Sequence, residues 1–247
     1  MKYMRRRNKI IIAVLFAITI FLVGFVVWAQ IPLGPMTDVY EALNSDSEVK
    51  VTTDRWLVFE PVNSSKNVGF IIYPGGRVDY RSYAPLAHTI AAHGFLTIIA
   101  PMPLNLAVFG VNTAGDIINF YPQITSWAIG GHSLGGTIAA QFAYENPSKI
   151  AGLILWAAYP ASGNNMSKYS LLVTTIYGSN DGLVSISQIQ DSLKQLPPTT
   201  IQVEIAGGNH AQFGWYGDQP GDNNAEISRE RQQSQILNAT LQSLLGL

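Results

Sequence analysis

Seven short apolar runs, separated by segments of helical length, follow one another from residue 55 to residue 205. Several runs are almost continuously apolar, which is typical of strands that helices cover on both faces. This alternation predicts an α/β fold with a doubly wound, mostly parallel sheet. The predicted strands are 55–60, 68–73, 95–100, 127–131, 151–157, 171–177 and 200–205, and the predicted helices are 80–93, 112–121, 134–146, 185–195 and 225–245.

Composition excludes several classes of function. The chain has no cysteine, which rules out disulfides, thiolate metal sites, iron–sulfur clusters and cysteine nucleophiles. Five of its 15 basic residues fall within the first nine positions, and all 16 acidic residues come later, so the body of the chain is acidic. We therefore expect no nucleic-acid partner, because binding phosphates requires a basic face.

An apolar segment at residues 10–29 is long enough to cross a membrane. Only Thr19 and Gly24 interrupt it, and about 20 helical residues span a hydrocarbon core of ~30 Å. The basic residues before it are expected to keep the N-terminus in the cytoplasm and the body outside. We expect a single-pass anchor in the cell membrane; the alternative is a signal peptide cleaved after Ala29, which would release a secreted domain.

The expected organisation has four parts. A cytoplasmic basic segment, 1–9, precedes the transmembrane anchor, 10–29. Residues 30–50 are mixed and polar, and we interpret them as a tether or a first docking segment. No Pro-, Gly- or Ser-rich stretch divides the remainder, so residues 51–247 are expected to form one domain that carries the chemistry.

A candidate nucleophile lies where a predicted strand meets a predicted helix. The sequence Gly131-His132-Ser133-Leu134-Gly135 matches the pattern G-x-S-x-G. In that context the chain makes a sharp turn that projects the serine oxygen above the sheet, and the glycines avoid collisions with neighbouring backbone. The alternative is a chance Gly-Ser-Gly turn. The position between strand and helix favours Ser133 as a nucleophile.

A serine hydroxyl needs a neighbouring base and an acid that orients the base. His210 follows the last predicted strand in a Gly-rich loop and is the expected base. His88 and His93 are interpreted as helix-face or capping residues, and His132 as a packing residue that points away from the serine. Asp181 follows the preceding strand and is the expected acid, in the chain order Ser, Asp, His; otherwise it caps the next helix.

The other carboxylates are weaker candidates for the acid. Asp191 lies within a predicted helix, and Asp218 and Asp222 follow the histidine in the chain. Asp218 and Asp222, with two asparagines after them, resemble calcium ligands only in composition and lack the EF-hand order. We therefore expect no metal and no cofactor.

An oxyanion formed at the serine needs hydrogen-bond donors. The backbone N–H of Leu134 is the first expected donor, because it opens the following helix. The second is expected from Gly76 or Arg77 in the loop after strand 68–73, where glycines allow close approach of a substrate. Alternatively, Arg77 pairs with Asp79 and holds this loop.

The segments GGHSLGG, GSNDG and GGNHAQFGWYG, in that order, resemble the α/β-hydrolase superfamily. Together with YPGGRVDYRSYAPLA and APMPLNLAVF they are similar to small, membrane-anchored bacterial α/β-hydrolases of the dienelactone-hydrolase-like group, over residues 54–246. The resemblance implies a serine hydrolase with its catalytic roles on Ser133, Asp181 and His210. Dienelactone hydrolases proper use a cysteine nucleophile, so their substrate is not implied for this chain.

Only residues 159–170 separate two strands where many of these hydrolases insert a cap, so no large cap domain is expected. Loops 102–111 and 211–224 would then wall the substrate pocket. Aromatic residues of these loops either line that pocket or shield the loops from water. They are Phe109, Phe213, Trp215 and Tyr216.

These observations predict an exported serine hydrolase that cleaves a small or short-chain carboxylic ester. Amide and lactone bonds are alternative targets of the same chemistry. A second class of function is a non-catalytic, membrane-tethered binding protein that retains the hydrolase fold. Such a protein is expected to have lost at least one of Ser133, Asp181 and His210, and all three are present.

Overall fold

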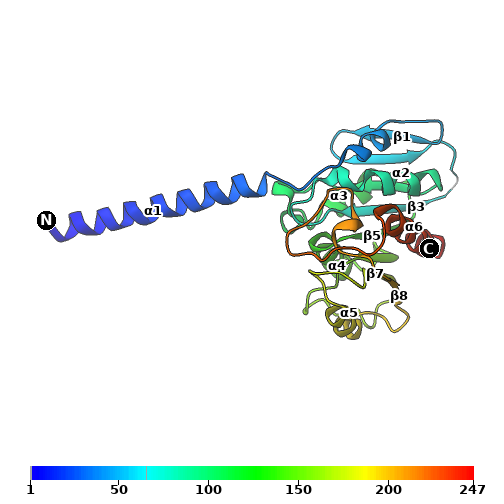
Figure 1. The fold of residues 1–247 in the computed structure, drawn as a ribbon. Helices are drawn as coiled ribbons and strands as arrows, with labels where there is room; N and C mark the ends of the chain where they lie inside the picture. Colours follow the sequence, from blue (N-terminus) through cyan, green and yellow to red (C-terminus); the bar gives the residue numbers. More distant parts are fainter. Residues whose placement is uncertain (1, 65) are drawn as a thin grey trace.

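The computed structural model describes residues 2–64 and 66–247, with side chains from Asn8 onward. One eight-stranded sheet lies at the centre of the body (Figure 1), in the order β1-β2-β4-β3-β5-β6-β7-β8. All neighbours from β4 to β8 are parallel, which confirms the predicted mostly parallel sheet. The strands are β1 (Val49–Thr53), β2 (Leu57–Pro61), β3 (Val68–Tyr73), β4 (Leu96–Ile99), β5 (Ser126–His132), β6 (Gly152–Trp156), β7 (Leu172–Gly178) and β8 (Ile201–Ile205).

The first strand of the sheet was not among the predicted ones. β1 pairs antiparallel with β2, and β2 pairs antiparallel with β4. The sequence of β1, VKVTT, has one buried residue and is otherwise half-buried or exposed. It therefore lacks the continuous apolar run that marks the central strands. The sheet thus begins within the segment 30–50 that was expected to be a tether.

Helices cover both faces of the sheet. α2 (Ala84–Ala92) and α6 (Arg229–Leu245) pack on one face with Phe59, Phe70 and Trp156 in the core between them and the sheet. α3 (Thr113–Phe120) and α4 (Leu134–Glu145) pack on the other. The short α5 (Ile186–Ser192) begins at a capping box on Ser185, as the polar start of predicted helix 185–195 favours.

The remaining differences from the predicted helices lie at their ends. Residues 80–83 form a 3₁₀ turn, η3 (Tyr80–Tyr83), and the α-helix starts after it with Pro85 in its first turn. The last helix begins at Arg229, where the Ser228 side chain accepts a hydrogen bond from the Arg231 backbone N–H. A proline and a capping serine therefore set these boundaries more sharply than the apolar pattern does.

α1 (Lys2–Ala29) projects from the body as a single long helix (Figure 1). Within the described residues, Asn8–Ala29 is the one stretch that is long and apolar enough to cross a membrane, and it is largely exposed except at Ala29, where it meets the body. Of the predicted basic segment 1–9, Met1 and the side chains up to residue 7 lie outside what the structure describes.

The chain after α1 lies against the body from its first residues. Leu33 forms a parallel bridge with Val78, and the Met36 backbone N–H donates to the Trp215 carbonyl at 2.8 Å. Val39 is fully buried in the core under α2. Of the two interpretations of segment 30–50, these contacts favour the docking segment over the tether.

Candidate active site

Four loops with polar residues meet at the carboxyl edge of the parallel sheet. They follow β3, β5, β7 and β8, and they carry Gly76, Ser133, Asp181 and His210 respectively. Because the carboxyl ends of parallel strands lie at one edge, this is where an open α/β sheet binds its ligands. The topology therefore brings the residues singled out from the sequence to one edge of the molecule.

Ser133 occupies the sharp turn between β5 and α4. Its backbone has φ 53° and ψ −125°, a left-handed value of φ that non-glycine residues rarely adopt. Its N–H donates to the Trp156 carbonyl at 2.9 Å, and its carbonyl accepts from Thr137 at 3.1 Å. These bonds to β6 and to the first turn of α4 hold the strained turn in place. Such strain is characteristic of functional positions.

The glycines around Ser133 are required by the closeness of other backbone. A Cβ atom on Gly131 would lie 2.3 Å from the Tyr73 carbonyl oxygen, and one on Gly135 would lie 2.2 Å from the same atom. A Cβ on Gly136 would lie 2.6 Å from the Gly131 carbonyl oxygen. Any side chain at these positions would separate α4 from β3 and β5. The G-x-S-x-G spacing is therefore a packing requirement of this turn.

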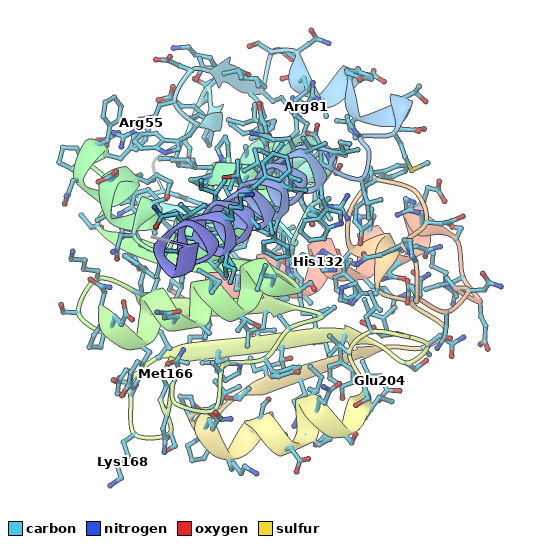
Figure 2. The ribbon with its side chains drawn as sticks, turned by 90° about the vertical axis from the view of Figure 1, so that its left-hand side faces the viewer. Arg55, Arg81, His132, Met166, Lys168 and Glu204 are labelled. Atoms are coloured by element: carbon cyan, nitrogen blue, oxygen red, sulfur yellow. The ribbon has the colours of Figure 1, made fainter. Side chains whose placement is uncertain are left out.

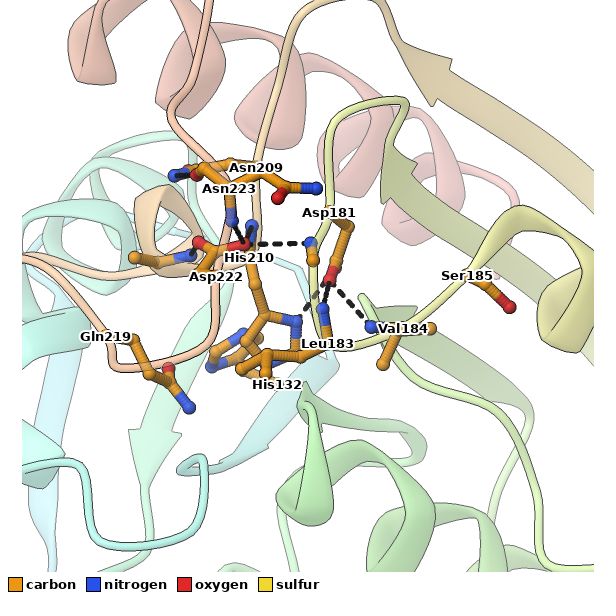
Figure 3. A network of polar contacts seen from close by, with 12 residues as sticks. His132, Asp181, Leu183, Val184, Ser185, Asn209, His210, Gln219, Asp222 and Asn223 are labelled. Carbon is orange, nitrogen blue, oxygen red and sulfur yellow. Dashed lines mark hydrogen bonds and ion pairs between the residues drawn. The ribbon is translucent and has the colours of Figure 1, made fainter.

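Asp181 and His210 form a buried pair (Figure 3). Their Oδ2 and Nδ1 atoms are 2.8 Å apart, and the two side chains are 1% and 0% exposed. The other oxygen of Asp181, Oδ1, accepts the backbone N–H groups of Leu183 and Val184 at 2.8 and 2.7 Å. The carboxylate thus receives three hydrogen bonds, which fix it against the imidazole and satisfy its charge away from water.

The second ring nitrogen of His210 is free. Its Nε2 is buried and has no hydrogen-bond partner among the described residues, and no hydrogen bond joins it to Ser133 Oγ. With Nδ1–H donating to Asp181, Nε2 carries the lone pair of the neutral ring. Hydrogen bonds of catalytic groups are commonly long or unformed without substrate. The arrangement leaves an oriented acceptor at the edge where Ser133 lies.

Asp222 ties the loops of the pair together, and the sequence did not single it out for this role. Its Oδ1 accepts the N–H of Gly182 at 2.9 Å and that of His210 at 3.3 Å, and its Oδ2 accepts the N–H of Ala211 at 2.8 Å (Figure 3). One carboxylate therefore bridges the loop after β7 and the loop after β8. The only signal in the sequence was an aspartate in a polar loop close after the histidine.

His132 packs against the Asp181–His210 pair. Its ring is fully buried, with its centroid 4.5 Å from that of His210, and it stacks on Phe213 at 5.6 Å. Burial, together with the nearby His210, lowers the pKa of His132 well below its usual value. The prediction of a packing residue agrees with this burial.

A hydrogen-bond chain connects His132 to the loop after β3. The Gly75 N–H donates to the Tyr83 hydroxyl oxygen at 3.0 Å, and the Tyr83 hydroxyl lies 2.9 Å from His132 Nδ1. A Cβ on Gly75 would lie 2.8 Å from that nitrogen, so only glycine fits. The turn at Ser133 between β5 and α4, called the elbow below, is therefore held at a fixed separation from the loop that carries Gly76.

The expected oxyanion donors differ in availability. The Arg77 N–H is used, because it donates to the Asn105 carbonyl at 2.7 Å. The Gly76 N–H makes no hydrogen bond with the described residues, and a Cβ on Gly76 would lie 3.1 Å from the Leu134 side chain. Leu134 is the first residue of α4, whose N–H has no partner within the helix. Gly76 and Leu134 thus offer neighbouring free donors, and Arg77 does not.

The alternative expected for Arg77, an ion pair with Asp79, is also absent from the described residues. Asp79 pairs with Arg81 at 2.6 Å. Arg77 has φ 55°, and its guanidinium donates to the carbonyls of Trp28 and Ile31 at the end of α1. The left-handed backbone turns the residue toward the N-terminal segment, which the local sequence pattern does not reveal.

The four aromatic pocket candidates separate into two groups. Phe213 and Tyr216 are buried against His132, so they shield the loop as packing residues and do not line an open site. Trp215 lies beside α2 and α6 on the flank of the body, in a shallow hollow. Phe109 is 53% exposed, in the 3₁₀ turn η5 (Ala107–Phe109) at the carboxyl edge. Of the four, only Phe109 is exposed near the site.

The other two histidines lie away from the site. His93 ends α2 as its capping residue, and the ring of His88, on the same helix, is 3.5 Å from Asp46. Both positions agree with the predicted helix-face or capping roles. Among the described residues no group of three or more His, Cys, Asp or Glu is arranged to hold a metal ion.

A family model described as the alpha/beta hydrolase family matches residues 69–234, from β3 into α6. The chain belongs to the α/β-hydrolase family. This membership agrees with the sheet order, the elbow at Ser133 and the chain order of Ser133, Asp181 and His210. A search of curated proteins gives no match.

Solved structures of other α/β-hydrolases share the fold. A dienelactone hydrolase from Anabaena variabilis superposes with a TM-score of 0.63 at 16% identity, covering 81% of this chain and 99% of its own. A thermophilic esterase from the Planctomycetes species Thermogutta terrifontis, with butyrate bound, gives 0.60 at 11% identity, covering 81% and 94%. Est1E from Butyrivibrio proteoclasticus, with ferulic acid bound, gives 0.58 at 15%, covering 81% and 98%. At these identities the likeness concerns the fold.

Proposed function

We propose that this α/β-hydrolase is a membrane-anchored serine esterase that cleaves carboxylic esters with a small acyl group through an acyl-enzyme on Ser133. The observation that carries the proposal is the buried Asp181–His210 pair, with a free Nε2, at the edge where the strained elbow holds Ser133. Burying a polar atom without a hydrogen-bond partner costs stability, so the free Nε2 of His210 favours a chemical role for this pair beyond packing.

Acylation begins when Ser133 Oγ attacks the carbonyl carbon of the ester while His210 Nε2 takes its proton. Asp181 accepts the hydrogen bond from Nδ1–H and stabilises the imidazolium that forms. The carbonyl oxygen becomes an oxyanion and accepts hydrogen bonds from the N–H groups of Gly76 and Leu134. In enzymes of this type one such donor contributes ~10²–10³ in turnover.

The tetrahedral intermediate then collapses. The bond to the alcohol oxygen breaks, and the imidazolium returns its proton to that oxygen, so the alcohol leaves and the acyl group stays on Ser133. In the second half, His210 takes a proton from water as the water oxygen attacks the acyl carbon. The carboxylic acid leaves and Ser133 Oγ regains its proton, which restores the resting enzyme.

The substrate and cellular position are part of the proposal. Residues 157–171, which separate β6 from β7, are too few for a cap domain that would enclose a long acyl chain, which favours small acyl groups. The length and composition of Asn8–Ala29 support an anchor, and the leading basic residues favour a cytoplasmic N-terminus with the catalytic domain on the far side.

Labelling with a fluorophosphonate probe tests the proposal without knowledge of the substrate, because the probe reacts with activated serines. The full chain in detergent is expected to label, and Ser133→Ala is expected to abolish both labelling and hydrolysis of short-chain esters. Ser162→Ala, an exposed serine outside the site, is the matched control and should label fully. Labelling that survives Ser133→Ala would place the nucleophile elsewhere; a folded wild-type chain that does not label would support the non-catalytic binding protein.

A further inference from the structure

The end of α1 is clamped to the loop that carries the proposed oxyanion donor. Arg77 donates from Nε to the Trp28 carbonyl at 3.0 Å and from Nη2 to the Ile31 carbonyl at 2.7 Å. The Asn105 side-chain amide donates to the Ala29 carbonyl at 2.9 Å, and Ala29 is fully buried. These three hydrogen bonds join the helix end directly to the body, with no free linker between them.

The clamp limits how far the site can lie from a membrane. The 22 residues Asn8–Ala29 are ~33 Å long as a helix, which matches a hydrocarbon core of ~30 Å and puts Ala29 at its boundary. Leu33 bridges Val78 only four residues later, and four residues reach at most ~14 Å. The loop of Gly76 and Arg77 therefore lies at the level of the lipid headgroups.

The side chains at this junction suit a headgroup region. The Arg77 guanidinium lies 4.1 Å above the Trp28 ring, and Trp28 is half-exposed at the end of the apolar helix. Tryptophan is enriched at this depth in membranes, and arginine reaches from it toward phosphates. The residue beside the oxyanion donor is thus also an interface residue.

The edge of the sheet that carries Ser133 is the edge from which α1 leaves. Figure 2 looks at this side, with α1 running toward the viewer and His132 labelled beside it. The loop of Arg77 connects the two places. Arg77 binds the Trp28 carbonyl, while in the same loop a Cβ on Gly75 would lie 2.8 Å from His132 Nδ1 and one on Gly76 would lie 3.1 Å from the Leu134 side chain. Exposed apolar side chains stand around the same edge: Ile31, Val108, Phe109 and Leu183.

We propose that the clamped junction turns the active-site edge toward the bilayer, and that the substrate is an ester carried by an amphiphile of that leaflet, with the small acyl group at the headgroup level. The substrate class rests on the proposed function, because it assumes the anchor and the acyl-enzyme on Ser133. Exposed apolar side chains also occur at the opposite edge, including Val62 and Ile201, so the position of α1, and not exposure alone, selects the surface.

The first test measures contact with lipid and requires no activity. The chain has no cysteine, so Val108→Cys provides a single labelling site for an environment-sensitive fluorophore. In full-length protein reconstituted into vesicles of phosphatidylethanolamine and phosphatidylglycerol, nitroxide-bearing lipids are expected to quench this label. The label on Val62→Cys, at the opposite edge, is expected to stay unquenched. Equal quenching at both sites, or at neither, overturns the proposed orientation.

The second test measures substrate preference. Full-length enzyme in the same vesicles is given para-nitrophenyl acetate and the acetate of a nitrophenol that carries a long alkyl chain and partitions into the bilayer. We expect kcat/KM for the membrane-held ester to be at least ~10-fold higher, because confinement raises its concentration at the site. The ratio should fall toward one in excess detergent micelles, which dilute the ester away from the enzyme.

A variant outside the pocket loops separates membrane contact from the chemistry. Ile31→Ser is expected to lower the rate on the membrane-held ester several-fold and to leave the rate on para-nitrophenyl acetate unchanged. Val62→Ser with Ile201→Ser, at the opposite edge, should change neither. Equal rates on the two esters in vesicles overturn the substrate class while the proposed esterase stands. Failure to hydrolyse either ester, together with absent fluorophosphonate labelling, overturns the esterase itself.

Discussion

At the scale of single residues, Asp222 positions the Asp181–His210 pair, because its carboxylate accepts hydrogen bonds from N–H groups of both loops that carry the pair. We predict that Asp222→Ala lowers kcat by about 10²-fold with little change in KM, because misplacing a catalytic group by ~1 Å costs this much. Asp222→Asn keeps one oxygen acceptor and should recover part of the loss. Steady-state kinetics on a short-chain ester check this, with the exposed Asp218→Ala as control. A full-rate Asp222→Ala enzyme would contradict the positioning role.

His132 makes stability depend on pH. Burial holds its pKa well below the usual ~6.5, so the folded chain leaves this ring neutral where the unfolded chain protonates it. Unfolding then takes up a proton, and the free energy of unfolding falls as pH drops below ~6.5, by up to ~1.4 kcal/mol per pH unit for this ring. Chemical denaturation of the full chain in detergent between pH ~5 and ~7 measures the slope. His132→Asn should flatten it.

Single residues also show where sequence reasoning stops. Ser133, Asp181 and His210 were predicted because each follows a recognisable apolar strand, and the structure brings their loops to one edge. Asp222 and Tyr83 were not, because their roles depend on backbone N–H groups and on a ring that are distant in the sequence. A side chain whose hydrogen bonds position other residues leaves no pattern in the nearby sequence. A side chain that directly follows a buried strand can be recognised from the apolar run before it.

At the scale of elements, α4 lies close against the backbone of β3 and β5 at the elbow. We predict that Gly135→Ala destabilises the fold by several kcal/mol or prevents folding, because its Cβ would lie 2.2 Å from one backbone oxygen and 2.3 Å from the next. Overpacking against side chains costs ~1–3 kcal/mol, and backbone yields less than side chains do. Gly163→Ala has open space and should be neutral. Melting temperatures of the two variants check this, and a native melting temperature for Gly135→Ala would contradict the packing requirement that explains the motif.

The elements that the sequence predicted well share one property. Central strands such as β4 and β6 are buried along their whole length, so their apolar runs are almost continuous. β1 is an edge strand with mostly exposed residues. Its strand conformation is stabilised by its pairing with β2 and not by an apolar run of its own. Helix starts at 84 and 229 depended on a proline and on a serine cap. Continuous burial is visible in a sequence, and edge pairing is not.

At the scale of the whole molecule, the segment after α1 is part of the folded body. The backbone of Leu33 exchanges hydrogen bonds with the residues on either side of Val78, donating to the Arg77 carbonyl at 2.7 Å and accepting from the Asp79 N–H at 2.9 Å. The loop of the proposed oxyanion donor is therefore braced from the anchor side as well as from the sheet. We predict that removing residues 1–30 leaves fluorophosphonate labelling, because this bridge remains, and that removing residues 1–35 abolishes it while Ser133 is still present.

The same junction predicts that the anchor is retained in the mature protein. Cleavage after Ala29 would remove the Trp28 and Ala29 carbonyls, and with them the acceptors of Arg77 Nε and the Asn105 amide. The Asn105 amide is partly buried, and a buried donor left without its partner costs ~1–3 kcal/mol, so the intact junction is more stable than the cleaved one. The mass of the protein purified from membranes should therefore include residues before 29, and alkaline extraction should leave it in the membrane.

A reporter that works only outside the cytoplasm, fused after Leu247, should be active, since the leading basic residues hold the N-terminus inside. A soluble product that begins at Gln30 would instead mean that the chain is exported by a cleaved signal, and the bilayer-facing orientation would fall with the anchor.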